Sequence, residues 1–303
     1  MLWRTLLVLT WSIAVAGQER PTFTARTDLV VVHATVEDRR GAAVPNLDRD
    51  SFLVYEDNRP QTISFFSSAD APASIGLLID NSTSMATKRE RVIASAVRFA
   101  ELSNPADEIF VLLFNEHVHE AWAPRVIDES DISDLQGTLR SQIAARGQTA
   151  LYDAIVAGLE RLTRAKHSRQ VLVIVSDGSD NASHTDLADV MSRVQQSTAM
   201  IYAVGLNDPV DRDGNPKLLK RLATLTGGEV FSPDKADEVP AALDHIARDI
   251  RATYTIGFVP TNQIQDGALR KLRVVARHPD GRQLKVQTRT GYAAPGREPN
   301  GER

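Results

Sequence analysis

The first regular hydrophobic pattern covers Leu29–Glu37, where a β-branched run gives way to alternating apolar and polar positions. The even-numbered residues of this stretch are apolar, so they line one face of a predicted strand. Further along, Phe52–Tyr55 and Thr62–Phe66 flank the turn-rich segment Glu56–Pro60, which predicts a hairpin. Residues 17–73 therefore form an N-terminal β segment with too few strands to be securely stable alone.

Between residues 74 and 251 short buried runs alternate with stretches in which apolar residues recur at helical spacing. Strands separated by helices predict an α/β fold, a doubly wound and mostly parallel sheet of the Rossmann-like kind. The strand at Val118–Ala121 follows its predecessor too closely for a crossover, so we expect it to pair antiparallel at a sheet edge. The predicted strands are Ile75–Ile79, Ile109–Phe114, Val118–Ala121, Val171–Val175, Ala199–Val204 and Glu229–Phe231, and the predicted helices are Lys88–Leu102, Ala150–Leu162, Leu187–Val194 and Pro240–Ile250.

Residues 252–296 return to strand patterns. Tyr254–Val259 is the first predicted strand of this segment, and Leu272–Ala276 and Leu284–Thr288 follow it. The last two flank Pro279-Asp280-Gly281, a turn sequence that predicts a hairpin.

We expect the two β segments, residues 17–73 and 252–296, to join into one sandwich-like domain into which residues 74–251 are inserted. Neither segment has enough strands to be stable by itself, and domain termini often lie close together, which makes an insertion tolerable. The polar end at residues 297–303 is expected to be flexible.

Composition supports a folded chain and removes several classes of protein. The 303 residues are 42% hydrophobic and 24% charged, which is enough apolar material for a core. The 35 Lys and Arg residues against 39 Asp and Glu give a formal charge of −4 with no long run of one sign, so nucleic-acid binding has little support. The chain has no cysteine, which excludes a disulfide framework, a thiolate nucleophile and a zinc ribbon.

The first 16 residues read as a secretory signal peptide. Arg4 precedes a mostly apolar stretch, Thr5–Ala16, which ends in an A-x-A sequence and predicts cleavage after Ala16. An uncleaved anchor is the alternative, but the stretch is shorter than the roughly 20 residues needed to span a bilayer. No later segment approaches roughly 18 unbroken apolar residues, so we expect an exported protein, periplasmic or secreted, without a transmembrane segment in the mature chain.

Hydroxyl and carboxylate side chains follow the predicted strands. Asp80, Ser82 and Ser84 form a D-x-S-x-S sequence directly after one buried strand, Asp177 follows another, and Thr149 precedes a helix. If the two strands meet where crossovers go to opposite faces, these side chains share one crevice. Such hard oxygen ligands suit Mg²⁺, or alternatively Mn²⁺ or Ca²⁺. The alternative interpretation is that Asp80 and Ser82 merely cap the next helix.

Because of these five side chains, the segment 74–251 resembles a von Willebrand factor type A domain, whose metal-ion-dependent adhesion site contains the same residue types. The resemblance implies that Ser82 and Ser84 bind metal directly, that Thr149 binds it directly in at least one state, and that Asp80 and Asp177 act mainly through water. The commonest family sequence has Gly between the two serines, where this chain has Thr83. The flanking sequences, LVVVHATVEDRRGAAVPNLDRDSFLVYEDNRPQTISFF, YTIGFVPTN and KLRVVARHPDGRQLKVQTRTGY, are similar to exported bacterial proteins of the acidobacterial VWFA-related family.

The predicted function is that of a non-enzymatic, exported binding module. An Asp or Glu carboxylate on a protein partner would supply the last ligand of the bound Mg²⁺. No general base is evident among the five residues, so they do not imply catalysis. Two alternatives remain: a metal-dependent hydrolase that uses the same residues, and a scaffold in which the metal is structural only. The chain lacks G-x-S-x-G, H-E-x-x-H and P-loop sequences, which disfavours the hydrolase.

Overall fold

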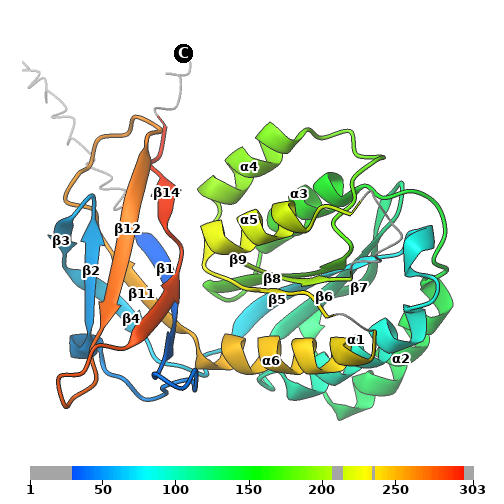
Figure 1. Cartoon of the computed structure of the whole chain (residues 1–303), viewed down its shortest axis with the longest axis horizontal. Helices are drawn as coiled ribbons and strands as arrows, with labels where there is room; N and C mark the ends of the chain where they lie inside the picture. Colours follow the sequence, from blue (N-terminus) through cyan, green and yellow to red (C-terminus); the bar gives the residue numbers. More distant parts are fainter. Residues whose placement is uncertain (1–28, 207–213, 234–235, 297–303) are drawn as a thin grey trace, which may run out of the picture.

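The computed structural model describes residues 29–206, 214–233 and 236–296. It consists of an α/β unit and a β unit that lie side by side (Figure 1). The predicted signal peptide at residues 1–16 and the end at residues 297–303 lie outside the described residues. Within the described part, none of the helices has the length and apolar character needed to cross a bilayer.

One six-stranded sheet forms the centre of the α/β unit. Its strands are β5 (Ala73–Asp80), β6 (Glu108–Phe114), β7 (Val118–Val126), β8 (Arg169–Ser176), β9 (Met200–Gly205) and β10 (Val230–Phe231). They follow the order β10-β9-β8-β5-β6-β7, and all neighbours are parallel except β6 and β7. The expected antiparallel pairing at the edge is confirmed. Every residue of β5 is buried, as expected of a central strand covered on both faces.

Helices cover both faces of this sheet. In the described residues they are α1 (Arg89–Leu102), α2 (Glu129–Gln142), α3 (Leu151–Leu162), α4 (Leu187–Gln196), α5 (Pro216–Thr226) and α6 (Val239–Ala252). One apolar core forms between the sheet and α1, α2 and α6, and a second forms beneath α3, α4 and α5 (Figure 1). The α1 and α4 crossovers therefore lie on opposite faces, and the predicted doubly wound α/β fold is confirmed.

The sequence pattern does not predict two of the helices that the structure contains, α2 and α5. In α2 only Leu135 and Leu139 are buried, so its apolar stripe is too sparse to stand out. The helix α5 does carry start and stop signals: Asn215 caps its first turn, Pro216 opens it, and Gly227 ends it with φ of +86°.

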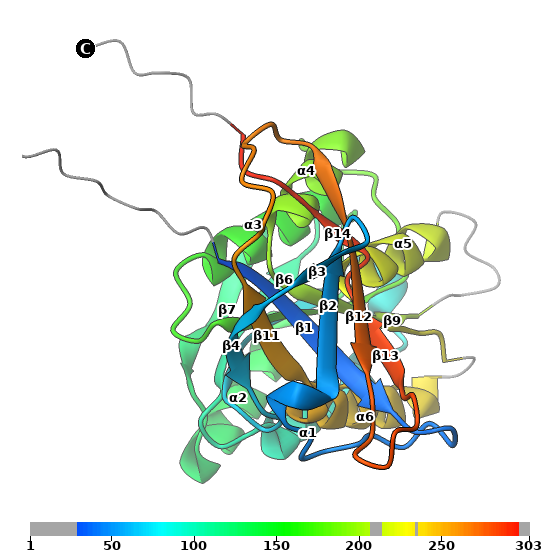
Figure 2. The same ribbon diagram turned by 90° about the vertical axis from the view of Figure 1, so that its left-hand side faces the viewer.

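The β unit consists of two antiparallel sheets packed face to face (Figure 2). Its strands are β1 (Val30–Glu37), β2 (Phe52–Glu56), β3 (Arg59–Gln61), β4 (Ile63–Ser67), β11 (Tyr254–Phe258), β12 (Leu269–Ala276), β13 (Lys285–Thr288) and β14 (Gly291–Ala293). The sheets have the orders β13-β1-β11-β4 and β14-β12-β2-β3, so each takes two strands from either side of the α/β unit. Apolar side chains of the two inner faces, among them Val32 and Ile256, form a third core.

Both predicted hairpins of the β unit are wrong in their pairing. The strand β2 turns at Asp57-Asn58, both with positive φ, and pairs with the short β3, whereas β4 crosses to pair with β11 in the other sheet. Likewise β12 pairs with β2 and β14, while β13 pairs with β1. Only a single bridge, Arg277 to Gln283, remains of that second hairpin. In both places the chain changes sheets, because each strand must place its own apolar face in the sandwich core.

The sheet that contains β1 is buried on its second face as well, because it packs against the α/β unit. His33 and Thr35 point to that side, where His33 Nδ1 lies 3.2 Å from Thr255 Oγ1 and Thr35 Oγ1 lies 3.2 Å from Thr253 Oγ1. The alternation in β1 therefore separates two buried surfaces, an apolar one in the sandwich and a polar one at the junction.

Two buried arginines hold this junction. Arg169, at the start of β8, donates to main-chain oxygens of the two segments that connect the α/β unit to the β unit, one before β5 and one at the end of α6. Arg289 donates through Nη1 to Ser197 O at 2.8 Å and through Nη2 to Gln195 O at 3.2 Å, just beyond α4 and in its last turn. The helix α6 runs directly into β11, so the two units are continuous as well as packed together (Figure 1). The acceptors of Arg169 are Ser68, Ala71, Ile250 and Thr253.

Candidate functional site

The candidate site lies where β5 and β8 end at the same edge of the central sheet. These strands are parallel neighbours, and Ile79 stands opposite Val175. The residues that follow, Asp80 and Asp177, are both 1% exposed. This edge is the position at which doubly wound sheets form ligand crevices, because the crossovers from the two strands leave to opposite faces.

The loop after β5 is organised by the side chain of Asp80. Its Oδ1 accepts a hydrogen bond from Ser82 N at 2.9 Å, and its Oδ2 accepts one from Ser176 Oγ at 2.7 Å. Ser82 Oγ lies 3.2 Å from Ser84 Oγ. Ser82 is the residue before a short 3-10 helix, Thr83–Met85, but its side chain makes no capping hydrogen bond. The two serine hydroxyls therefore face the carboxylates and not the next helix.

The second loop approaches the first through Asp177. Ser84 Oγ donates to Asp177 Oδ2 at 2.7 Å, and Asp177 Oδ1 accepts from Ser179 N at 2.9 Å. Gly178 follows with φ of +83°, and a Cβ there would lie 2.8 Å from the carbonyl oxygen of Asn215. This position needs glycine for both its backbone conformation and its close approach to the start of α5.

Thr149 lies in a third loop that is tied to the other two. The main-chain oxygen of Gly147 accepts hydrogen bonds from Thr83 N at 3.2 Å and from Thr83 Oγ1 at 3.1 Å. On its other side, Thr149 N donates to Asn181 Oδ1 at 2.8 Å, and Thr149 O accepts from Asn181 N at 2.9 Å. Thr149 is 3% exposed. The structure thus brings together the loops that carry all five residues selected from the sequence.

The electrostatics of this edge favour a cation. Burial raises the pKa of Asp80 to about 6, and the neighbouring carboxylate of Asp177 adds to the rise. Within the described ranges, no Lys, Arg or His forms an ion pair with either carboxylate. Two buried carboxylates without a paired cation are costly, and a divalent ion removes that cost. Three hydroxyls and two carboxylates are also the hard oxygen donors that Mg²⁺ prefers, so the residues fit such an ion.

Residues beyond the five selected ones position them. Ser176 orients Asp80, and Asn181 holds the main chain of Thr149 through both its side chain and its backbone. Asp180 Oδ1 accepts from Tyr152 N at 3.0 Å, at the first turn of α3. The only sequence feature that connects these three residues with the site is their closeness to Asp177. A hydrogen bond between two loops leaves no other recognisable pattern in the sequence.

A comparison with family profiles identifies the α/β unit. The profile of the von Willebrand factor type A domain matches residues 74–247, which is more than half of the chain. No curated protein sequence matches this chain significantly.

Solved structures with this fold include a von Willebrand factor type A protein from Catenulispora acidiphila. It is 13% identical, with a TM-score of 0.54, and the match covers 92% of this chain and 78% of that one. Proximal thread matrix protein 1 from the mussel byssus is 17% identical, with a TM-score of 0.50, over 62% of this chain and 48% of that one. The vWF domain of the pilus tip protein Mfa5 from Porphyromonas gingivalis is 13% identical, with a TM-score of 0.47, over 60% and 95% of the two chains. At these identities the likeness concerns the fold alone.

Proposed function

Because the chain belongs to the von Willebrand factor type A domain family, we propose that it is a non-enzymatic binding module with a Mg²⁺-dependent adhesion site. Domains of this family are commonly protein-binding or adhesion modules. The ligand is a protein that presents an Asp or Glu carboxylate. Residues 74–251 form the von Willebrand A domain, and it is inserted into a β domain built from residues 17–73 and 252–296.

One observation supports the metal site above the others. Ser84 and Asp177 are hydrogen-bonded at 2.7 Å although they belong to loops 93 residues apart. The contact joins the ends of β5 and β8 around two carboxylates that have almost no exposure to water. Residues that only capped a helix would not need the second loop, nor a second buried carboxylate.

In this proposal the five side chains contact the ion in two ways. The hydroxyls of Ser82, Ser84 and Thr149 bind it directly, while Asp80 and Asp177 act mainly through water. Bound Mg²⁺ supplies positive charge and an open coordination position, which suits an incoming carboxylate. Because Asp80 and Asp177 contact the ion mainly through water, their carboxylates lie farther from it. Less negative charge then opposes the incoming carboxylate of the partner.

The hydrogen bonds of the two serines support binding in place of catalysis. Their hydroxyls bond to each other and to carboxylates. In the described part of the chain neither hydroxyl is hydrogen-bonded to a histidine or lysine that would act as a general base. We further propose that the protein is exported, periplasmic or secreted, because residues 1–16 have the sequence of a signal peptide. The narrower likeness to the acidobacterial VWFA-related family stays a prediction.

Calorimetric titration with Mg²⁺, followed by a pull-down from the native envelope fraction with and without chelator, tests this function. The wild-type protein should bind one Mg²⁺ and capture a partner only when Mg²⁺ is present. Asp80→Ala should lose both properties while keeping its circular dichroism spectrum. Asp134→Ala, at an exposed position on α2, is the matched control and should behave as wild type. Capture that survives both the chelator and Asp80→Ala would refute metal-dependent recognition.

A further inference from the structure

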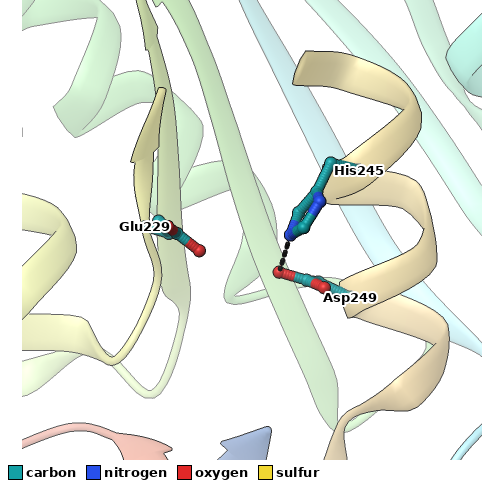
Figure 3. A group of neighbouring side chains, drawn as sticks. All are labelled: Glu229, His245 and Asp249. Carbon is teal, nitrogen blue, oxygen red and sulfur yellow. Dashed lines mark ion pairs between the residues drawn. The ribbon is translucent and has the colours of Figure 1, made fainter. Parts of the chain in front are cut away.

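A second cluster of metal-ligating side chains lies at the junction of the two units. Glu229 directly precedes β10, and His245 and Asp249 are one turn apart on α6. One ligand atom from each residue lies within 4.8 Å of the others, and His245 Nε2 is 3.4 Å from Asp249 Oδ2. Figure 3 shows Glu229 reaching from the sheet edge toward the two side chains on the helix. Three ligands from two elements therefore face one point.

The surroundings hold these side chains in place. The ring of Phe231 packs against the imidazole of His245, with centroids 5.0 Å apart. The main chain of Glu229 is fixed because its oxygen accepts from Ala203 N at 3.0 Å. The side chain of Asp249 is 13% exposed, whereas that of His245 is 44% exposed. The cluster thus has a rigid inner side and a ligand that an ion can reach from solvent.

The charges of the cluster are not balanced by its own residues. Burial raises the pKa of Asp249, and the negative charges of Glu229 and Glu37 raise it further, whereas His245 and Arg248 lower it. Lys285 Nζ is 2.7 Å from Glu37 Oε2, so this lysine pairs mainly with Glu37 and interacts with Glu229 only through its charge. Carboxylates crowded in this way are favourable when a cation lies between them.

A buried hydroxyl also responds to the charge of the cluster. Tyr202 on β9 is fully buried, and its hydroxyl lies near those of Thr35 and Thr253, although it makes no hydrogen bond of normal geometry among the described residues. Burial raises its pKa, and the negative charge of Asp249 raises it further.

We propose that Glu229, His245 and Asp249 bind a divalent transition metal, best matched by Zn²⁺. One imidazole with two carboxylates is a donor set that Zn²⁺ accepts, with water in a fourth position, whereas Mg²⁺ and Ca²⁺ prefer oxygen alone. The ion differs in kind from the one proposed at the ends of β5 and β8. It joins α6 to the edge strand β10 and so fixes the helix that leads into the β unit.

Zinc titration of the purified full chain in excess Mg²⁺, followed by calorimetry, tests the second site. The wild-type protein should bind one Zn²⁺, and His245→Ala should weaken the binding at least about tenfold. Glu229→Gln, which keeps the size of the side chain, should weaken it as well. Asp80→Ala should retain full zinc affinity, so a failure of the adhesion site and a failure of this site give different results. Circular dichroism checks that each variant is folded.

The matched control is His184→Ala, because His184 Nδ1 also lies near a carboxylate, 3.3 Å from Asp153 Oδ2, but has no third ligand within the described residues. This variant should bind zinc as wild type does. Co²⁺ provides a second measurement, since its visible absorption reports coordination by the histidine and should vanish in His245→Ala. Equal zinc affinity in wild type and His245→Ala, or no binding by wild type, would overturn the proposal; the former would indicate an adventitious ion only.

Discussion

Ser84 Oγ lies 2.7 Å from Asp177 Oδ2, and this single hydrogen bond connects two loops that are 93 residues apart. It exists because β5 and β8 are parallel neighbours, so that their ends meet at one edge. The geometry makes Ser84 a donor to Asp177 when no ion is bound and a candidate ligand when one is.

Ser84→Ala should therefore weaken Mg²⁺ binding by about tenfold or more, equivalent to about 1.4 kcal/mol, because it removes one direct ligand. Calorimetry with Mg²⁺ measures the change. Thr83→Gly is the control next to it: it removes the hydrogen bond from Thr83 Oγ1 to Gly147 O but keeps the one from Thr83 N, and glycine is the commonest family residue at this position. Weakening of equal size in Thr83→Gly would show that the loop conformation, and not the Ser84 hydroxyl, controls affinity.

Gly227→Ala should destabilise the protein by roughly 1–3 kcal/mol or more. Gly227 has φ of +86°, and a Cβ there would lie 2.5 Å from Arg289 N and 2.6 Å from the carbonyl carbon of Thr288. Both clashes are with the main chain next to β13, so the two units would have to move apart. Urea unfolding measures the free energy. Gly137→Ala, on an exposed part of α2 with nothing within 4 Å, should instead stabilise by up to about 1 kcal/mol.

Arg169→Ala should lower the free energy of unfolding by at least about 3 kcal/mol, because several buried main-chain oxygens lose their donor together. Arg169→Lys should rescue only a small part of this loss, since a single ammonium group cannot span the acceptors that the guanidinium reaches. Arg164→Ala, at an exposed position after α3, should change little. Equal stability of Arg169→Ala and wild type would show that apolar packing alone holds the junction.

His33 should make the protein less stable in mild acid. Burial, together with the positive charges of Arg169 and Arg289, lowers the pKa of His33 from 6.5 to about 3. The unfolded chain therefore binds a proton between about pH 6.5 and pH 3 that the folded chain does not, so stability falls as the pH falls below 6.5. The contribution of His33 to the pH dependence should be about 2 kcal/mol between pH 7.5 and pH 5. Burial raises the pKa of Asp80, Asp107 and Asp249 to about 6, and these groups act in the opposite direction over the same window, so the His33 contribution is the difference between wild type and His33→Gln.

Urea titrations of wild type and His33→Gln at the two pH values measure this difference, and the variant should lose less stability, or gain more, on going to pH 5. His117→Gln, at an exposed position, is the control and should keep the wild-type pH dependence. A pH dependence that is unchanged in His33→Gln would assign the acid sensitivity to other groups.

The elements that the sequence predicts well are those whose burial is one-sided or complete. The run Ile75–Ile79 is apolar throughout and lies in the central strand, while the helix near Lys88–Leu102 shows a clear apolar stripe. Pairing in the β unit was not predictable to the same extent. A strand such as β4 has the same alternation whether it pairs with its neighbour in sequence or crosses to the other sheet, so local pattern cannot decide.

The five residues at the ends of β5 and β8 could be selected because their motif is local and their positions follow strands. Ser176 and Asn181 orient them through hydrogen bonds between loops, which no spacing reveals. The cluster of Glu229, His245 and Asp249 is even harder to recognise in the sequence. Pairs at i, i+4 such as His245 and Asp249 are common on helices, and Glu229 comes close to them only because of the arrangement of the sheet.

The interleaved strands of the β unit impose an order of events on the growing chain. His33 and Thr255, whose side chains meet across β1 and β11, are 222 residues apart. At ribosomal speeds the first strands wait roughly 10 to 45 s for their partners, with unpaired edges open to other chains. The α/β unit is contiguous and complete before then, and its two ends meet where Arg251 Nε lies 2.8 Å from Asp70 Oδ1. Its early folding would bring the first strands to the place where the last ones emerge, and so shorten their exposure to aggregation.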